Sequence, residues 1–199
     1  SFAGYELGLD SEIVKYITSA NIATGFHAGD PDWMARTVSL AVENGVGIGA
    51  HPAYPDLGGF GRRNMDLTPD EVSNAVTYQV GALAAFAPAR KLQHVKPHGA
   101  LYNTAVRDAD VAEAVVSAIK AFDPELIHVV LAGSQWEEIA RNHGVRVARE
   151  CYADRAVTPQ RTLVPRSQPG AVIHEPEAVL DRSLKLATTG RVTAIDGTE

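Results

Sequence analysis

The stretch Leu126-Ile127-His128-Val129-Val130-Leu131 is nearly all apolar, and it predicts a strand that is buried on both faces. Strands of this kind belong to parallel sheets that helices cover on both sides. The flanking segments agree with this, because residues 108–122 and 134–143 have helical patterns and residues 145–151 form another strand-like run. This part of the chain therefore predicts alternating strands and helices around a mainly parallel sheet.

The same alternation extends toward both ends of the chain. The clearest helix start is Thr68-Pro69-Asp70-Glu71, a capping box with proline at the first helical position. We expect strands at residues 21–26, 46–50, 92–97, 126–131, 145–151 and 192–195, and helices at residues 11–18, 30–44, 68–87, 108–122, 134–143 and 176–188. No linker marks a second domain, so residues 1–199 are expected to form one domain of about six strands.

Side chains capable of chemistry follow four of the expected strands. They are His27 and Asp30, His51 and Asp56, Lys96 and His98, and Asp154 and Arg155. In a closed barrel the loops after many strands meet at one mouth, whereas an open doubly wound sheet uses one switch point. The distribution favours a barrel. The run Gly45-Val46-Gly47-Ile48-Gly49 leads into a strand instead of leaving one for a helix, which excludes a dinucleotide fingerprint.

Composition and charge narrow the possible partners. The 199 residues carry a formal net charge of -6, and the 18 lysines and arginines form no runs, which argues against nucleic acid. No apolar run is long enough for a membrane span, and no signal peptide is visible. Cys151 is the one cysteine and is expected to be a buried, inert thiol, so the chain fits a cytoplasmic protein without disulfides.

Two histidines stand directly after short strands. His27 lies in Gly25-Phe26-His27-Ala28-Gly29-Asp30, and His51 lies in Gly49-Ala50-His51-Pro52. Barrel enzymes place catalytic groups at this end of their strands. With Asp30, the two imidazoles could bind a divalent metal ion such as zinc, or they could act as general acid and base. Structural histidines bonded to backbone carbonyls are the competing interpretation, and spacing alone does not separate these possibilities.

A third group is His94-Val95-Lys96-Pro97-His98, where Pro97 disfavours a helix. On a strand, residues 94, 96 and 98 share one face, and burying two imidazoles and an ammonium there is costly without a function. An exposed edge strand is the alternative. The long loops add arginines that could hold a carboxylate or phosphoryl group, although any one of them could equally form a surface ion pair. They are Arg62, Arg63, Arg155 and Arg166.

Five ordered stretches of the sequence resemble the LamB/YcsF family. They are residues 19–30, residues 49–56, residues 94–103, Tyr152-Ala153-Asp154-Arg155 and Leu163-Val164-Pro165-Arg166. The resemblance runs from the start of the chain to about Gly190. It implies an irregular (β/α) barrel of about seven strands, related to the glycoside hydrolase and deacetylase barrels. Family members carry a further strand before the position of Ser1 and another after Glu199, so we expect the barrel to be incomplete at both ends.

The resemblance also implies an activity. The family includes one component, the A subunit, of the ATP-dependent 5-oxoprolinase (EC 3.5.2.9), which opens the lactam of 5-oxoproline to L-glutamate together with subunits B and C. ATP would serve the whole nucleotide-binding complex, because no G-x-x-x-x-G-K-[ST] loop occurs in this chain. The alternatives are a metal-dependent amide or polysaccharide deacetylase acting alone, and a non-catalytic ligand-binding subunit. Formation of a homo-oligomer is possible.

Position and resemblance together give a set of expected site residues. The expected catalytic residues are His27, Asp30, His51, Lys96 and His98. The expected substrate-binding residues are Asp56, Arg62, Asn103, Asp154, Arg155 and Arg166. A divalent metal is a possible cofactor, with His27 and His51 as candidate ligands.

Overall fold

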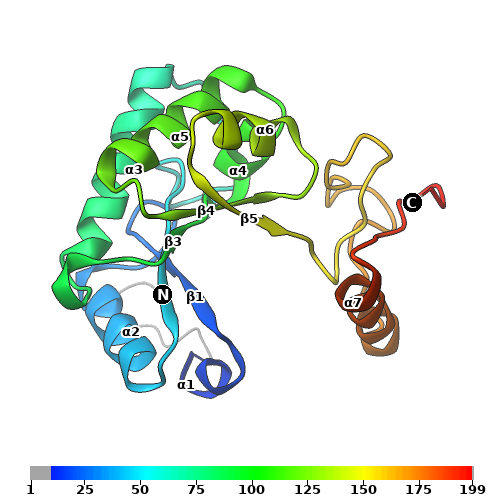
Figure 1. Ribbon diagram of the computed structural model, residues 1–199, viewed down its shortest axis with the longest axis horizontal. Coiled ribbons are helices and arrows are strands. Elements are labelled where there is room, and N and C mark those ends of the chain that lie inside the picture. The colour runs from blue at the N-terminus through cyan, green and yellow to red at the C-terminus, as the bar shows by residue number, and fades with distance from the viewer. Residues whose placement is uncertain (1–9, 199) are drawn as a thin grey trace. The chain divides into compact units, whose positions relative to one another are not determined.

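The structure is a computed structural model that describes residues 10–198. Its sheet has five strands in the order β1-β2-β3-β4-β5 (Figure 1). They are β1 (Ser19–Ala23), β2 (Gly47–His51), β3 (His94–Val95), β4 (Ile127–Leu131) and β5 (Arg146–Glu150). The pairs β1–β2, β2–β3 and β3–β4 are parallel. The strands follow one another in chain order without the reversal that marks a doubly wound sheet, which agrees with a barrel-like fold.

Helices connect the strands, and most begin where the sequence predicts. The α-helices are α1 (Asp10–Ile13), α2 (Pro31–Glu43), α3 (Pro69–Ala84), α4 (Gly99–Ala105), α5 (Ala109–Phe122), α6 (Gln135–Asn142) and α7 (Pro176–Thr189), and the 3-10 helices are η1 (Val14–Tyr16) and η2 (Pro88–Arg90). Thr68 and Glu71 complete the predicted capping box, because each side chain accepts a hydrogen bond from the other residue's backbone N–H. Asp30 is the N-cap of α2, and its side chain accepts a hydrogen bond from the N–H of Trp33 at 2.9 Å.

Helices α3 and α5 pack closely on one another and, with α6, lie along the same side of the sheet (Figure 1). The apolar faces of these helices are buried. The core includes Val76, Val80, Leu83, Val115, Ile119, Ala50, Val95 and Val130. Within the described residues, no helix combines the length and the apolar character that crossing a bilayer requires.

The glycines of β2 are explained by packing against the neighbouring strand. A Cβ atom at Gly49 would overlap the imidazole of His94, and one at Gly47 would overlap the side-chain amide of Gln93. Glycine is therefore needed where the side chains of the segment entering β3 cross β2. This agrees with the exclusion of a phosphate-binding role for this run.

Several sequence predictions are wrong in detail. The sheet has five strands among the described residues, not the six expected from the sequence, because residues 192–195 lie in a loop whose Ala194 N–H bonds the carbonyl of Thr198 at 2.7 Å. The seven-residue helix α4 was not predicted, since its sequence is short and its start is obscured by Pro97 and His98. Cys151 is exposed, because it follows the last residue of β5.

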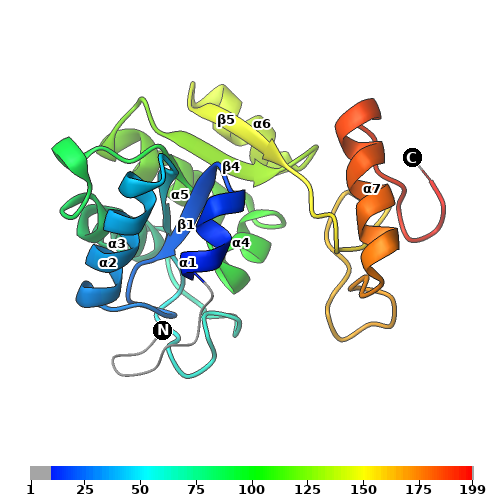
Figure 2. The ribbon, with the colours of Figure 1, turned by 90° about the horizontal axis from the view of Figure 1, so that it is seen from below.

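The chain divides into two compact units. The first contains the described residues up to Val130 together with Gln135–Ala148, and it holds most of the sheet. The second contains Leu131–Ser134 and the described residues from Arg149 onward. Figure 2 shows that from Arg149 onward the chain, after the end of β5, consists of α7 and long loops. The expectation of one domain over residues 1–199 stays a prediction.

Candidate functional site

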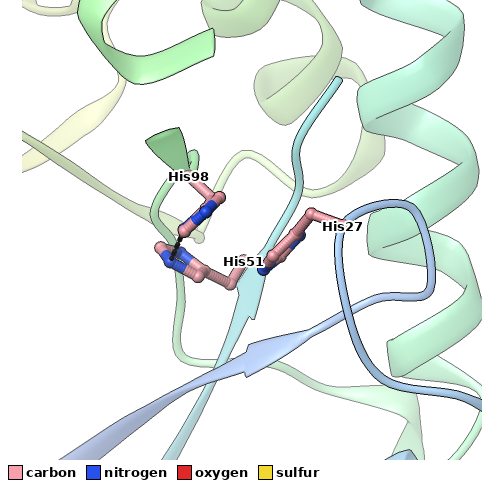
Figure 3. Close-up of side chains that lie close together, drawn as sticks. All are labelled: His27, His51 and His98. Carbon is pink, nitrogen blue, oxygen red and sulfur yellow. Dashed lines mark hydrogen bonds between the residues drawn. The ribbon is translucent and has the colours of Figure 1, made fainter. Parts of the chain in front are cut away.

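Three of the predicted catalytic histidines meet at the carboxyl ends of the first three strands (Figure 3). His27 lies in the loop between β1 and α2, His51 is the last residue of β2, and His98 precedes the first residue of α4. Each offers one ring nitrogen, and these nitrogens all lie within 4.8 Å of one another. The parallel, in-order strands produce this meeting, since they bring successive strand ends to the same edge of the sheet.

Backbone carbonyls fix the orientation of two of these rings. Nδ1 of His51 lies 2.5 Å from the carbonyl oxygen of Lys96, and Nε2 of His98 lies 2.9 Å from that of Phe60. A carbonyl oxygen only accepts, so each ring donates its N–H to its carbonyl. The other nitrogens, Nε2 of His51 and Nδ1 of His98, face each other at 3.0 Å (Figure 3).

The third ring, His27, is buried and stacks on His98 with ring centroids 4.0 Å apart and an interplanar angle of 9°. Phe60 closes the cluster edge-on, with its centroid 5.5 Å from that of His27 and 5.2 Å from that of His98. Nδ1 of His27 is buried and makes no hydrogen bond within the described chain. This nitrogen is therefore an unsatisfied polar atom inside the site.

The surroundings keep these imidazoles neutral. Burial, with the nearby His98 second, lowers the pKa of His27 to about 3. Burial lowers the pKa of His51 well below its usual range, and it also lowers the pKa of His98. Neutral rings keep one nitrogen lone pair each, which can accept a proton or bind a metal ion. Such low pKa values also make the rings weak bases.

Positive charge lies beside the cluster. Lys96 and Arg62 both contribute to lowering the pKa of His98, so their cationic groups act on that ring. The guanidinium carbon of Arg62 lies 5.2 Å from the ring centroid of Phe60. Two cations next to neutral histidines form a suitable environment for an anionic ligand.

A buried glutamine behind the histidines was missed by the sequence reasoning. Oε1 of Gln79 accepts from the hydroxyl of Thr24 at 3.0 Å and from the N–H of Ala53 at 2.9 Å. Its Nε2 donates to the carbonyls of Ala53 and Ala75, both at 2.9 Å. The side chain thereby ties α3 to the loop that carries His27 and to the loop that follows His51. Its position on the buried face of α3, where apolar residues are expected, was the available signal.

Gly61 allows the loop after β2 to close against the histidines. Its φ is +64°, and a Cβ atom there would lie 2.8 Å from Cβ of His27 and 2.9 Å from Cδ2 of His98. Both the left-handed backbone and the close approach require glycine. The loop is thus shaped to hold two of the three rings.

Two of the three predicted carboxylates, Asp30 and Asp56, have structural partners. One oxygen of Asp30 caps α2, while Oδ2 is buried and makes no hydrogen bond within the described residues. The buried carboxylate of Asp56 accepts from the N–H of Gly59 at 2.9 Å and from Nε of Arg63 at 2.8 Å, with Nη2 of Arg63 in a further contact. Hydrogen bonding to Arg63 lowers the pKa of Asp56 to about 2. Asp56 therefore organises the loop that contains Gly61.

His94, which the sequence groups with Lys96 and His98, is not part of the histidine cluster. His94 is buried, with Nε2 2.9 Å from Oδ1 of Asn21, so it does not join the group although it precedes Lys96 by two residues. Asn103 is exposed on α4. In the second unit, Asp154 and Arg166 are exposed.

Arg155 of the second unit is buried and is bonded to the backbone. Its Nη2 donates to the carbonyl of Val164 at 2.7 Å, and its Nε donates to that of Ala171 at 3.2 Å. These bonds hold together the loops of that unit.

A cavity of about 670 Å³ adjoins the histidines. Its lining includes His27, His51, His98 and Phe60, together with Asn21 of β1 and Trp33 of α2. Cavities of this size hold small-molecule ligands. The first unit therefore presents a concave site in which three imidazoles share one wall.

Parallel strands in chain order with polar side chains gathered at their carboxyl ends define an α/β protein of the kind that carries enzyme sites. The family model described as LamB/YcsF family matches residues 1–199, and the chain belongs to this family. The resemblance seen in the sequence is thereby confirmed.

Individual relatives are close. The chain is 57% identical to the 5-oxoprolinase A subunit of Syntrophobacter fumaroxidans, over 99% of this chain and 79% of that protein. It is also 57% identical to the 5-oxoprolinase A subunit of Pyrococcus furiosus, over 99% of this chain and 78% of that protein. The crystal structure of the lactam utilization protein from Thermus thermophilus superposes with a TM-score of 0.94 at 48% identity, covering 100% of this chain and 81% of that one.

Proposed function

We propose that this protein is the A subunit of a 5-oxoprolinase and takes part in opening the lactam ring of 5-oxoproline to L-glutamate. The names of the relatives support this, since several that are 51–57% identical are named as the A subunit of 5-oxoprolinase. The observation that carries the proposal is the meeting of His27, His51 and His98 beside a cavity of about 670 Å³.

The charges around the cavity suit this substrate. 5-Oxoproline is a small ring with one carboxylate, and Lys96 and Arg62 place positive charge beside the histidines. Asn103, Asp154 and Arg166 are exposed, and each is proposed as a substrate-binding residue on the ground of the family resemblance. Asp56 and Arg155 are proposed to act through the loops that they hold. Asp30 is proposed to contribute through Oδ2, the oxygen that does not cap α2.

The reaction needs partners, because an unstrained lactam is a stable amide and its opening requires coupling to ATP. The chain contains no G-x-x-x-x-G-K-[ST] loop. Subunits B and C are therefore proposed to use ATP to phosphorylate the lactam oxygen. This subunit would bind the activated ring, with Lys96 and Arg62 near its negative charge, while the histidine cluster directs water to the carbonyl carbon.

The proposed function also implies a complete fold and a place of action. The chain spans about four fifths of the length of the relatives it matches. We propose that further strands close the sheet into an irregular (β/α) barrel of about seven strands, of the type found in glycoside hydrolases and deacetylases. The enzyme is proposed to work in the cytoplasm as EC 3.5.2.9.

Turnover of 5-oxoproline by the reconstituted subunits with ATP tests the proposal. His51→Ala and Lys96→Ala should each lower turnover by on the order of 100-fold or more, as expected for loss of a group at the reacting centre. His174→Ala is the matched control, because His174 is exposed in the second unit, and it should retain full activity. Circular dichroism verifies folding of each variant. Full activity in both site variants would overturn the assignment.

A metal-dependent amide or polysaccharide deacetylase acting alone is the second candidate, and the three clustered histidines favour it. The two functions differ in their requirements. The deacetylase would act without ATP and without companion subunits, whereas the proposed oxoprolinase component would show no turnover of 5-oxoproline by itself.

A further inference from the structure

His51 and His98 have one hydrogen too few for the contacts that they make. Their rings form three close contacts: His51 to the carbonyl of Lys96 at 2.5 Å, His98 to the carbonyl of Phe60 at 2.9 Å, and one ring to the other at 3.0 Å. Each contact needs one hydrogen, since carbonyl oxygens and bare ring nitrogens only accept. Two neutral imidazoles carry one N–H each, so two hydrogens must serve three contacts.

The contact between the rings is the one left without a hydrogen. The carbonyls take both N–H groups, so the lone pairs of Nε2 of His51 and Nδ1 of His98 point toward each other. A positive charge is required there, either a third proton or a metal cation. A metal cation would bind both lone pairs at once, whereas a third proton would leave an added charge in a partly buried site.

His27 supplies a third nitrogen at the same place. Its Nδ1 is buried without a hydrogen-bond partner in the described chain, and the cluster's ligand nitrogens lie within 4.8 Å of one another. Three neutral imidazoles form a ligand set typical of catalytic zinc, which keeps a fourth position open. We propose that His27, His51 and His98 bind one divalent cation of the zinc class.

The surroundings resemble the outer shell of a metal site. A histidine that binds a metal through one nitrogen usually donates its other N–H to a carbonyl or carboxylate, which fixes the ring orientation. His51 and His98 both do this, through the carbonyls of Lys96 and Phe60. Glycine at position 61 leaves room for the rings of His27 and His98. These two carbonyls and Gly61 therefore orient two ligands, His51 and His98, toward one point before the ion binds.

Binding requires one movement. Tetrahedral zinc with bonds of about 2.0 to 2.1 Å places its ligand nitrogens about 3.3 Å apart, close to the present separation of His51 and His98. His27 is stacked parallel to His98 at 4.0 Å, whereas a metal ion lies in the plane of each imidazole that binds it. The ring of His27 must therefore turn out of the stack when the ion binds.

The inference deepens the proposed function, on which its catalytic consequence rests. A zinc-class ion supplies a water of lowered pKa and a Lewis acid for a carbonyl oxygen. This chemistry suits a site whose histidines are weak bases by themselves. Metal binding itself is independent of the reaction and can be measured without substrate.

The test is titration of the full chain, stripped with chelator, with zinc and with cobalt(II). Isothermal calorimetry and elemental analysis should give one ion per chain for the natural protein. His27→Gln, His51→Gln and His98→Gln should each weaken binding by at least the roughly 100-fold that loss of an outer-shell partner can cause. His174→Gln is the control and should bind as the natural protein does. Cobalt(II) in the natural protein should show the intense visible bands of a four- or five-coordinate ion.

Three results would overturn the proposal. The first is binding of less than one ion by the natural protein, and the second is equal affinity in the three variants. The third is a six-coordinate cobalt spectrum, which requires no variant and so cannot be attributed to misfolding. Turnover of 5-oxoproline by metal-free reconstituted enzyme would remove the metal's catalytic role and leave the proposed function intact. Binding of one ion per chain without any turnover of 5-oxoproline by the reconstituted subunits would support the metal site and contradict the proposed function.

Discussion

The two units use polar side chains in different ways. In the first unit the ring nitrogens of His27, His51 and His98 lie within 4.8 Å of one another. In the second unit the guanidinium of Arg155 is directed to backbone carbonyls, and Arg182 donates to the carbonyl of Arg155 at 3.1 Å. The difference follows from the backbone. Paired strands satisfy their own N–H and C=O groups, which frees strand-end side chains for chemistry, whereas loops need side chains as partners.

The largest expected effect on stability comes from replacing Arg155, the side chain that bonds the backbone carbonyls of the second unit. Arg155→Met should lower the stability of the unit by about 4 kcal/mol, because two hydrogen bonds from a charged group are lost and two buried carbonyls remain unsatisfied. Hydrogen exchange should accelerate at the amides of Ala156, Val164 and Ile173, which make bonds within the unit. Arg166→Met, at an exposed position, is the control. Unchanged exchange in Arg155→Met would refute the structural role.

The sequence predicted the histidine cluster because the rule behind it is local. A histidine directly after a strand needs only the strand to be recognised, and parallel strands then bring His27, His51 and His98 together. The roles of Asp56 and Arg155 could not be predicted in this way. Their partners are an arginine seven residues away and carbonyls 9 and 16 residues away, all positioned by loop conformations that no periodicity records.

The same limit explains the errors in the fold. The apolar run of β4 was recognised because burial on both faces leaves a continuous signal. Residues 192–195 have a similar composition, but they lie in a loop where Ile195 bonds the carbonyl of Val157 at 2.9 Å. Gln79 was missed because a single polar residue on an apolar helix face does not disturb the periodicity of the helix. Tertiary contacts decide such cases.

A smaller effect should come from filling the space beside the histidines. Gly61→Ala should cost about 2 kcal/mol, because a non-glycine residue is strained at a φ of +64°. The new methyl group would also press on His27 and His98 and displace the rings, so 5-oxoproline turnover should fall by on the order of 10- to 100-fold. Gly58→Ala in the same loop is the matched control, because its Cβ would meet only Nη2 of Arg63 at 3.5 Å. Equal turnover in both variants would show that ring placement is not critical.

The last comparison concerns the response of the first unit to acid. Burial lowers the pKa of His27 and His128 to about 3 and, with Lys96, that of His94 to about 4. All three lie in the first unit. Below pH 6.5 the unfolded chain binds protons that these folded rings do not, so stability should fall with pH from about 6.5 until it reaches the folded pKa values.

His128 isolates the contribution of one ring, because it is fully buried and is not one of the proposed metal ligands. Replacing it in His128→Leu should flatten the dependence of unfolding free energy on pH by about 1.4 kcal/mol per pH unit between pH 6 and 4. Urea unfolding of the variant and of the natural protein, with chelator present, measures the slope. An unaltered slope in His128→Leu would mean that His128 takes up its proton in the folded state, through an opening that reaches the core behind β4. The core of the first unit would then be open to protons, and the contrast drawn between its sheet and the loops of the second unit would no longer hold.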